Sequence, residues 1–134
     1  MPSIADVPET HRVLLESHLT AVLTTIDAQG RPQSTAVWYL LRDDELIVSV
    51  TDNRQKYKNL AANPHSTLFI IDPANSMRTL EIRAEVELVH DVDKTDVATI
   101  AIAYGADPEQ IKSMPGERYT VKFTPRRIVV NPPA

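Results

Sequence analysis

Residues 78–90 read RTLEIRAEVELVH, the clearest alternation of apolar and charged side chains in the chain. Successive side chains of a β-strand point to opposite faces, so this stretch would have one apolar and one charged face. The apolar face would hold Leu80, Ile82, Ala84, Val86 and Leu88, and the charged face Glu81, Arg83, Glu85 and Glu87. Such a long, one-sided strand is typical of a barrel wall.

Runs rich in apolar and β-branched residues lie on both sides of this strand and predict further strands. They cover residues 19–26, 33–41, 45–51, 66–71, 118–123 and 127–130. Short turns join the first three, which predicts an antiparallel meander. The nearly continuous apolar run 66–71 predicts a strand buried on both faces, and residues 72–77 are expected to form a loop.

Helices are expected at residues 8–17, 51–64 and 93–104, with another helical turn within 107–114. The length of 134 residues suits one domain, spanning residues 1–134, with its own core. Six or seven strands in a domain of this size predict a mainly β (α+β) fold, a small closed barrel with peripheral helices.

Composition narrows the classes of function. The net charge of −4 argues against general nucleic-acid binding, and the absence of cysteine excludes disulfides and thiolate chemistry. No apolar run approaches the length of a membrane span, and no basic, then apolar leader opens the chain. We therefore expect a cytoplasmic protein with no membrane partner.

Residues 51–64, TDNRQKYKNLAANP, combine a helix start with positive charge. Asp52 and Asn53 are good N-cap residues, and Pro64 would end the helix. Arg54, Lys56 and Lys58 place three cations at its start, where free backbone N–H groups also favour an anion. The stretch predicts a phosphate site; the alternative is a solvated surface helix.

Protein groups for catalysis are not evident in the sequence. The histidines, His11, His18, His65 and His90, are scattered without metal-ligand spacing, and we expect them at the surface or its boundary. The chain contains no P-loop, G-x-G-x-x-G or G-x-S-x-G motif. We therefore predict no metal site and name no catalytic residue, so a bound cofactor would have to carry any chemistry.

The order of these segments resembles a known family. GRPQSTAVWY at residues 30–39, followed by ELIVSVTDNRQKYKNLAANPHSTLFIID at 45–72, is similar to the pyridoxamine 5′-phosphate oxidase-like split β-barrel family. The greatest similarity is to the branch of oxidoreductases that use the deazaflavin coenzyme F420. The resemblance implies a six- to seven-stranded antiparallel split β-barrel and a homodimer with two cofactor sites between its subunits.

The resemblance also implies roles for individual residues. Arg54, Lys56 and Lys58 would bind the cofactor phosphate, and Asn59, which matches the asparagine of the same motif, would also be a cofactor-binding residue. Two strand segments would line the remainder of the cofactor: Ser49, Val50 and Thr51 beside the phosphate and ribityl chain, and Thr35, Ala36, Val37 and Trp38 beside the ring. Met77 would reach the cofactor of the partner subunit.

Two positions depart from the family pattern. Many relatives have an aromatic residue near Met77 and a glycine at Ala84, so the resemblance implies less about the substrate than about the phosphate. Trp38 could equally pack in the core or a dimer interface. Tyr104, Met114 and Tyr119 are expected in the core, with the rim of a substrate pocket as the alternative.

The sequence thus favours an F420-dependent oxidoreductase that transfers a hydride from the reduced deazaflavin to an electron-poor small molecule. Two alternatives stay open. One is an FMN-binding protein of the pyridoxamine 5′-phosphate oxidase type. The other is a non-catalytic protein that holds a flavin, a deazaflavin or a haem-type ligand.

Overall fold

The alternating stretch forms the central strand of a curled antiparallel sheet. The structure is a computed structural model that describes residues 2–133. Over this range the elements are a 3₁₀ turn (Ile4–Asp6), α1 (Glu9–Glu16), β1 (Ala21–Ile26), β2 (Pro32–Val37), β3 (Leu40–Arg42), β4 (Glu45–Thr51), α2 (Gln55–Ala62), β5 (His65–Asp72), β6 (Asn75–His90), α3 (Thr95–Ala103), α4 (Pro108–Lys112) and β7 (Arg118–Asn131).

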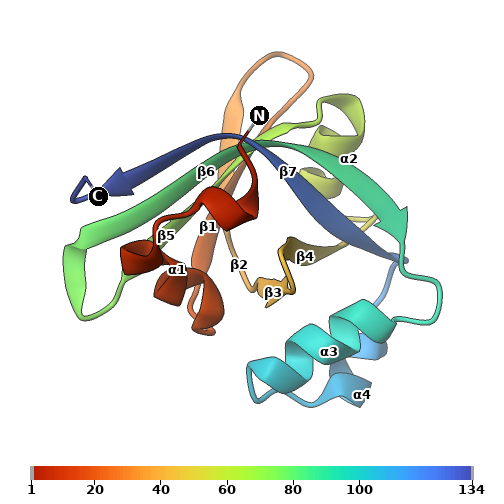
Figure 1. Cartoon of the computed structure of the whole chain (residues 1–134). Coiled ribbons are helices and arrows are strands. Elements are labelled where there is room, and N and C mark those ends of the chain that lie inside the picture. The colour runs from red at the N-terminus through yellow and green to blue at the C-terminus, as the bar shows by residue number, and fades with distance from the viewer. Residues whose placement is uncertain (1, 134) are drawn as a thin grey trace.

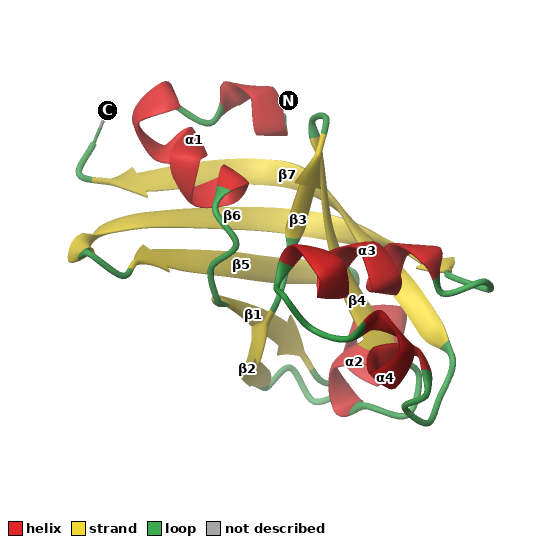
Figure 2. Cartoon of the chain, turned by 90° about the horizontal axis from the view of Figure 1, so that it is seen from below, coloured by secondary structure: helices red, strands yellow, loops and turns green. Residues whose placement is uncertain are grey.

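The strands lie in the order β2-β1-β5-β6-β7-β4-β3, and every paired neighbour is antiparallel. The long strands β5, β6 and β7 run side by side in Figure 2. The two ends of the order, β2 and β3, are edges, so the expectation of a closed barrel is wrong. The mainly β, seven-stranded split barrel implied by the family resemblance is confirmed for the described residues.

The predicted strand 33–41 is two strands, and the predicted meander is wrong. The chain leaves β2 at Trp38 and Tyr39 and starts β3 at the opposite end of the strand order. The backbone N–H of Tyr39 donates to the Tyr104 hydroxyl (3.1 Å), and the Tyr39 hydroxyl donates to the carbonyls of Leu14 (2.6 Å) and Ser17 (2.9 Å). Tyr39 is therefore fixed to α1 and Tyr104 at the point where the strand breaks.

Three other expectations about strands also fail. Residues 72–77 are mostly a tight β5–β6 hairpin, because β6 already starts at Asn75. The predicted final two strands are the single strand β7, with Arg126 as the extra residue of a β-bulge next to Pro125. Strand β5 is buried on one face only, since Ile71 on its other face is 43% exposed.

Helix α1 covers the inner face of the curled sheet. In Figure 1 the sheet arches over α1, and the inward side chains Leu14 and Leu15 are buried in the core. His11 is 2% exposed, which contradicts its expected surface position. Its ring nitrogens contact the Thr10 hydroxyl (2.9 Å) and the Asn131 carbonyl (3.0 Å), so its polar atoms have partners despite burial.

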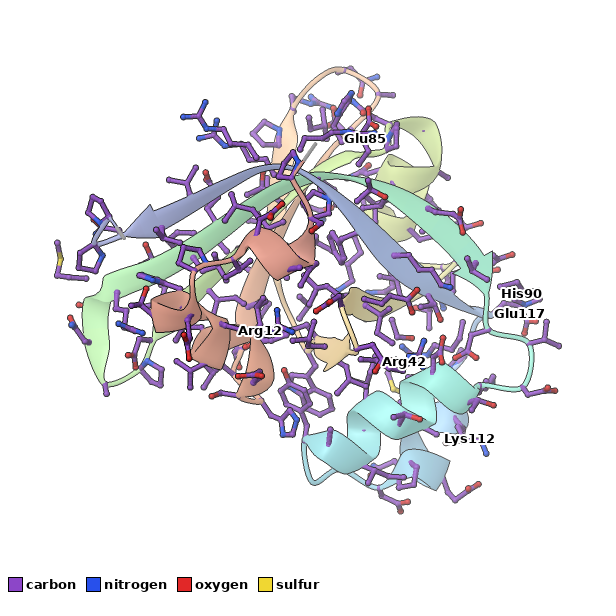
Figure 3. All side chains as sticks on the ribbon, in the orientation of Figure 1. Arg12, Arg42, Glu85, His90, Lys112 and Glu117 are labelled. Atoms are coloured by element: carbon purple, nitrogen blue, oxygen red, sulfur yellow. The ribbon has the colours of Figure 1, made fainter. Side chains whose placement is uncertain are left out.

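Helices α3 and α4 lie together at the end of the molecule near β4 and β7 (Figure 1). Asp96 of α3 accepts a hydrogen bond from Arg42 (2.8 Å), which lies beside α3 in Figure 3. The other oxygen of Asp96 accepts from the hydroxyl of Thr120 on β7 (2.8 Å). One carboxylate thus ties α3 to two strands.

In the part of the chain that the structure describes, the helices are too short or too polar to cross a membrane.

Candidate functional site

A pocket of about 220 Å³ opens where α2, α3 and α4 meet the ends of three strands. Figure 2 shows these helices gathered on the same side of the molecule as β4. The lining residues are Ala36, Val37, Trp38, Ser49, Val50, Thr51, Arg54, Lys56, Val97, Ile100, Ala101, Ile111, Met114 and Arg118. The pocket brings together parts of the chain that are far apart in the sequence.

The start of α2 forms one wall, but its predicted caps are wrong. Arg54 occupies the N-cap position, and no side chain caps the helix. Asp52 instead accepts the backbone N–H of Glu117 (3.0 Å), and the Asn53 amide donates to the Pro115 carbonyl (3.3 Å). These side chains fasten the loop before α2 to the loop before β7, which leaves the first turn of α2 without a side-chain cap.

Three cations gather at this end of the pocket. Arg54 and Lys56 come from the start of α2, and Arg118 comes from the start of β7, where it pairs in register with Thr51 of β4. Among the described residues, none of the three forms an ion pair with a carboxylate. The charge of Asp91 acts on Arg118 from beyond ion-pair distance. Cations brought together without an ion-paired carboxylate are the arrangement expected of an anion site.

The electrostatics of Lys56 reflect this arrangement. Burial lowers the pKa of the Lys56 ammonium, and the positive charges of Arg54 and Arg118 lower it further. The Lys56 nitrogen lies 3.5 Å from the hydroxyl of Thr35, a neutral partner that supplies no counter-charge. A bound anion would therefore find a partly desolvated ammonium with no competing acidic partner.

Arg118 is a second partly buried cation with few partners. Burial is the main cause that lowers the pKa of its guanidinium. Its other nitrogens make only long contacts, with the Ser49 hydroxyl (3.4 Å) and the Met114 sulfur (3.7 Å). Its Nε is buried and has no hydrogen-bond partner. Buried polar atoms normally have partners, so Arg118 keeps an unsatisfied donor at the edge of the pocket.

The other end of the pocket is apolar. Val97, Ile100 and Ala101 of α3 are buried, and Ile111 of α4 also lines the pocket. Trp38 stacks on the ring of Tyr104 with centroids 4.8 Å apart and planes 11° apart. An apolar end next to a cationic end suits a ligand with a flat ring and an anionic tail.

Eight of the twelve predicted cofactor residues line this pocket: Ala36, Val37, Trp38, Ser49, Val50, Thr51, Arg54 and Lys56. Thr35 lies just behind it, in contact with Lys56. Lys58 is exposed, and Asn59 is buried under α2. Met77 is 67% exposed on the β5–β6 hairpin, outside this pocket.

Sequence reasoning missed Arg118 and the walls supplied by α3 and α4. Arg118 was expected only as the first residue of a strand, and nothing in its local sequence marks it. The strand register is what brings it beside Thr51 and the start of α2. Of the three residues considered for a substrate rim, Met114 lines the pocket, Tyr104 lies behind Trp38, and Tyr119 packs against Tyr57 and His90.

No group of three or more histidine, aspartate or glutamate side chains that could hold a metal ion occurs within residues 2–133.

Comparison with solved structures places this fold among known ones. A structure described as an F420 reductase is 32% identical, with a TM-score of 0.83, over 92% of this chain and 98% of that one. A conserved hypothetical protein from Mycobacterium tuberculosis (21%, TM-score 0.74, covering 93% and 84% of the two chains) has the same fold. So does HutZ, a haem storage protein from Vibrio cholerae (18%, TM-score 0.73, 90% and 91%).

No curated protein sequence matches this chain. The model of the family described as pyridoxamine 5′-phosphate oxidase, in contrast, matches residues 7–130, which include every strand of the sheet but the last residue of β7. With that match over nearly the whole chain, and with a 32% identical structure covering 92% of it, the chain belongs to the pyridoxamine 5′-phosphate oxidase family.

Proposed function

We propose that this protein is an oxidoreductase that binds reduced coenzyme F420 and uses it to reduce an electron-poor organic molecule, with FMN as the alternative cofactor. The observation that carries the proposal is the cluster of Arg54, Lys56 and Arg118 in a pocket whose remaining walls are mostly apolar. Both cofactors join a flat ring to a phosphate. The similarity to a structure described as an F420 reductase supports F420 as the first choice.

The residues present fit such a cofactor. The terminal nitrogens of Arg118 make only long contacts, and Lys56 is partly desolvated beside two other cations, so a phosphate would be a favourable partner for both side chains. Arginine offers a planar fork of donors and lysine a compact charge, and both are common in phosphate sites. Lys58, exposed on α2 and outside the pocket lining, is not assigned to the phosphate.

The chain's own contribution is binding, orientation and exclusion of water. Arg54, Lys56 and Arg118 would hold the phosphate, and the segment 36–38 would lie along the ring. The buried side chains of α3 would keep water from the reacting face. The bound cofactor supplies the hydride chemistry. The described lining residues include no carboxylate or histidine, so we assign no catalytic acid or base.

We also propose that a second copy of the chain completes the site. The volume of about 220 Å³ is smaller than the roughly 300–1,000 Å³ typical of small-molecule pockets, so a single chain would hold only part of the cofactor. Trp38 and Ile71, which are 39% and 43% exposed, leave apolar surface available for a partner. Met77, which is exposed and does not line the pocket of its own chain, would contact the partner's cofactor.

Titration of the protein with F420 and with FMN, followed by absorbance and fluorescence, tests the proposal. We expect saturable binding of at least one cofactor, and oxidation of its reduced form when quinone-like acceptors or activated alkenes are added in stopped flow. Failure of both cofactors to bind would contradict the proposal.

A non-catalytic carrier of the same cofactor is the second candidate. The lack of an acid or base among the described lining residues favours it. Tight binding without turnover of any acceptor would select this function over the oxidoreductase.

A further inference from the structure

Helix α2, which presents Lys56 to the pocket, has little stability of its own. It has eight residues, no side-chain cap and no acidic residue in its first turn. Arg54, Lys56 and Lys58 place positive charge at the end where the helix dipole is already positive. Isolated helices shorter than about 12 residues are marginal in water, so tertiary contacts must hold α2 in place.

Asn59 supplies those contacts from the buried face of the helix. Its side chain is 2% exposed. Its amide nitrogen donates to the hydroxyl of Thr25 on β1 (3.0 Å) and to the side-chain carbonyl of Gln33 on β2 (3.1 Å). Its carbonyl oxygen accepts from Gln55 at the start of the helix (2.8 Å). One buried carboxamide thus links α2 to two strands.

Because Asn59 lies close to Lys56 on the helix, this link also affects the position of Lys56. The two residues are three apart, so they lie on neighbouring positions of one helix face. Lys56 contacts Thr35, and Asn59 contacts Gln33, two residues earlier on the same face of β2. A rotation or shift of α2 that broke the Asn59 bonds would also move the Lys56 ammonium away from β2.

We propose that Asn59 is a positioning residue that latches α2 to β1 and β2 and so sets the place of the Lys56 ammonium in the pocket. The latch acts through Lys56 and does not touch the cofactor, because Asn59 is buried and absent from the pocket lining. This differs from the direct contact that the family resemblance implies. The consequence for ligand binding rests on the proposed function, whereas the latch itself does not.

The first arm of the test needs no cofactor. Asn59→Leu keeps the branching and the number of side-chain heavy atoms and removes all three hydrogen bonds. Hydrogen exchange of the α2 amides should become at least about tenfold faster, while exchange in β6 and β7 stays unchanged. Tyr39→Phe is the matched control, since it removes a buried hydroxyl that donates to α1 carbonyls, away from α2. Unchanged α2 exchange in Asn59→Leu would overturn the latch.

The second arm compares FMN with riboflavin, and F420 with its phosphate-free chromophore. In Asn59→Leu the dissociation constant of the phosphorylated ligand should rise about tenfold, the equivalent of one lost hydrogen bond, and that of the phosphate-free ligand should not change. In a Lys56→Ala background the same substitution should have no further effect. Equal losses in both backgrounds, or for both ligands, would show direct contact and contradict the proposal.

The two arms keep the proposals separate. If the wild-type protein binds neither phosphorylated cofactor, the proposed function fails, and the exchange measurement still decides whether Asn59 latches α2.

Discussion

Lys56 of α2 and Arg118 of β7 line the same pocket. Burial is the largest cause that lowers the pKa of Lys56, and the positive charges of Arg54 and Arg118 lower it further. Sixty-two positions separate the two residues in sequence (118 minus 56). Like charges held this close destabilise the free protein, and the charge of Asp91, which acts on Arg118, offsets only part of this repulsion. Clusters of this kind are common at functional sites. A bound anion would remove the repulsion.

Lys56→Ala should weaken binding of the phosphorylated cofactor by about 1–3 kcal/mol, the scale of one charge-assisted hydrogen bond. The fold should persist, because the Lys56 nitrogen makes only a long contact with Thr35. Lys58→Ala is the matched control, an exposed lysine on the same helix. Fluorescence titration measures both variants, and equal affinities for Lys56→Ala and the wild type would refute the assignment of this lysine.

Arg118→Leu should weaken cofactor binding without lowering the stability of the protein. Cofactor affinity should fall by about 1.5–3 kcal/mol, since a charged donor is lost. The melting temperature of the cofactor-free protein should stay level or rise, because the change removes a partly buried cation whose Nε has no partner. Arg127→Leu, at an exposed position of β7, should alter neither property much. A large drop in the melting temperature of Arg118→Leu would indicate a structural role instead.

Binding should depend on pH through Lys56. Its pKa in the free protein is lower than the ordinary 10.5, and a bound phosphate would raise it. Affinity for FMN should therefore be constant between about pH 7, where its phosphate is almost fully ionised, and the free-protein pKa of Lys56, and fall as the pH rises through that pKa towards 10.5. The stability of the free protein should rise with pH in the same window, because the unfolded chain binds the extra proton there.

The affinity ratio of FMN to riboflavin isolates this effect, since ionisation of the ring is common to both ligands. Lys56→Arg should keep the ratio constant across the window, because arginine stays charged. A wild-type ratio that does not change with pH would contradict the account of Lys56.

Asp96→Asn should loosen α3. The substitution removes an ion pair with Arg42 and weakens the bond from the buried hydroxyl of Thr120, so the free energy of unfolding should fall by about 1–3 kcal/mol. Asp93→Asn, at an exposed position before the helix, is the control. Urea unfolding measures both, and equal midpoints for the two variants would show that the Asp96 bonds contribute little.

The Asp96 carboxylate should also make the stability of the protein sensitive to acid. Burial alone would raise the pKa of Asp96, but hydrogen bonds from Arg42 and Thr120, with the charges of Arg42 and Lys122, outweigh it and hold the pKa below the ordinary 3.8. Its stabilisation is therefore present above pH 3.8 and is lost as the pH falls through the lower, folded-state value. Asp96→Asn should abolish that part of the acid dependence.

Two copies of the chain should form a dimer in the absence of ligand. Light scattering after size exclusion should give twice the mass of the chain, because the proposed site is incomplete in one copy. Met77→Ala should leave the dimer intact and weaken cofactor binding, because Met77 would contact only the cofactor of the partner subunit. A monomer at micromolar concentration that binds the cofactor fully would contradict the proposed dimer.

The parts of the fold that were predictable from the sequence are those set by local pattern. The alternation at 78–90 identified the central strand β6, and the basic run at 54–58 marked the start of α2. The strand break at Tyr39 was not predictable, because a distant hydroxyl, that of Tyr104, takes its backbone N–H. The edge positions of β2 and β3 depend on that break.

The site, too, has residues that were predictable from local sequence and residues that were not. Lys56 stood out because it lies in a cationic helix start, whereas Arg118 joins it only through the register of β4 with β7. Asp52 and Asn53 have good N-cap chemistry, yet contacts with Glu117 and Pro115 override that local preference. Asn59 was expected to contact the cofactor, and only the packing of α2 on β1 and β2 shows what its amide binds.

A crystal structure of the protein with bound F420, and a second with FMN, would test the central claim most directly. The account predicts the cofactor phosphate within hydrogen-bonding distance of the Lys56 ammonium and the Arg118 guanidinium, with the ring against residues 36–38. A phosphate bound away from both side chains, with the ring outside this pocket, would contradict it.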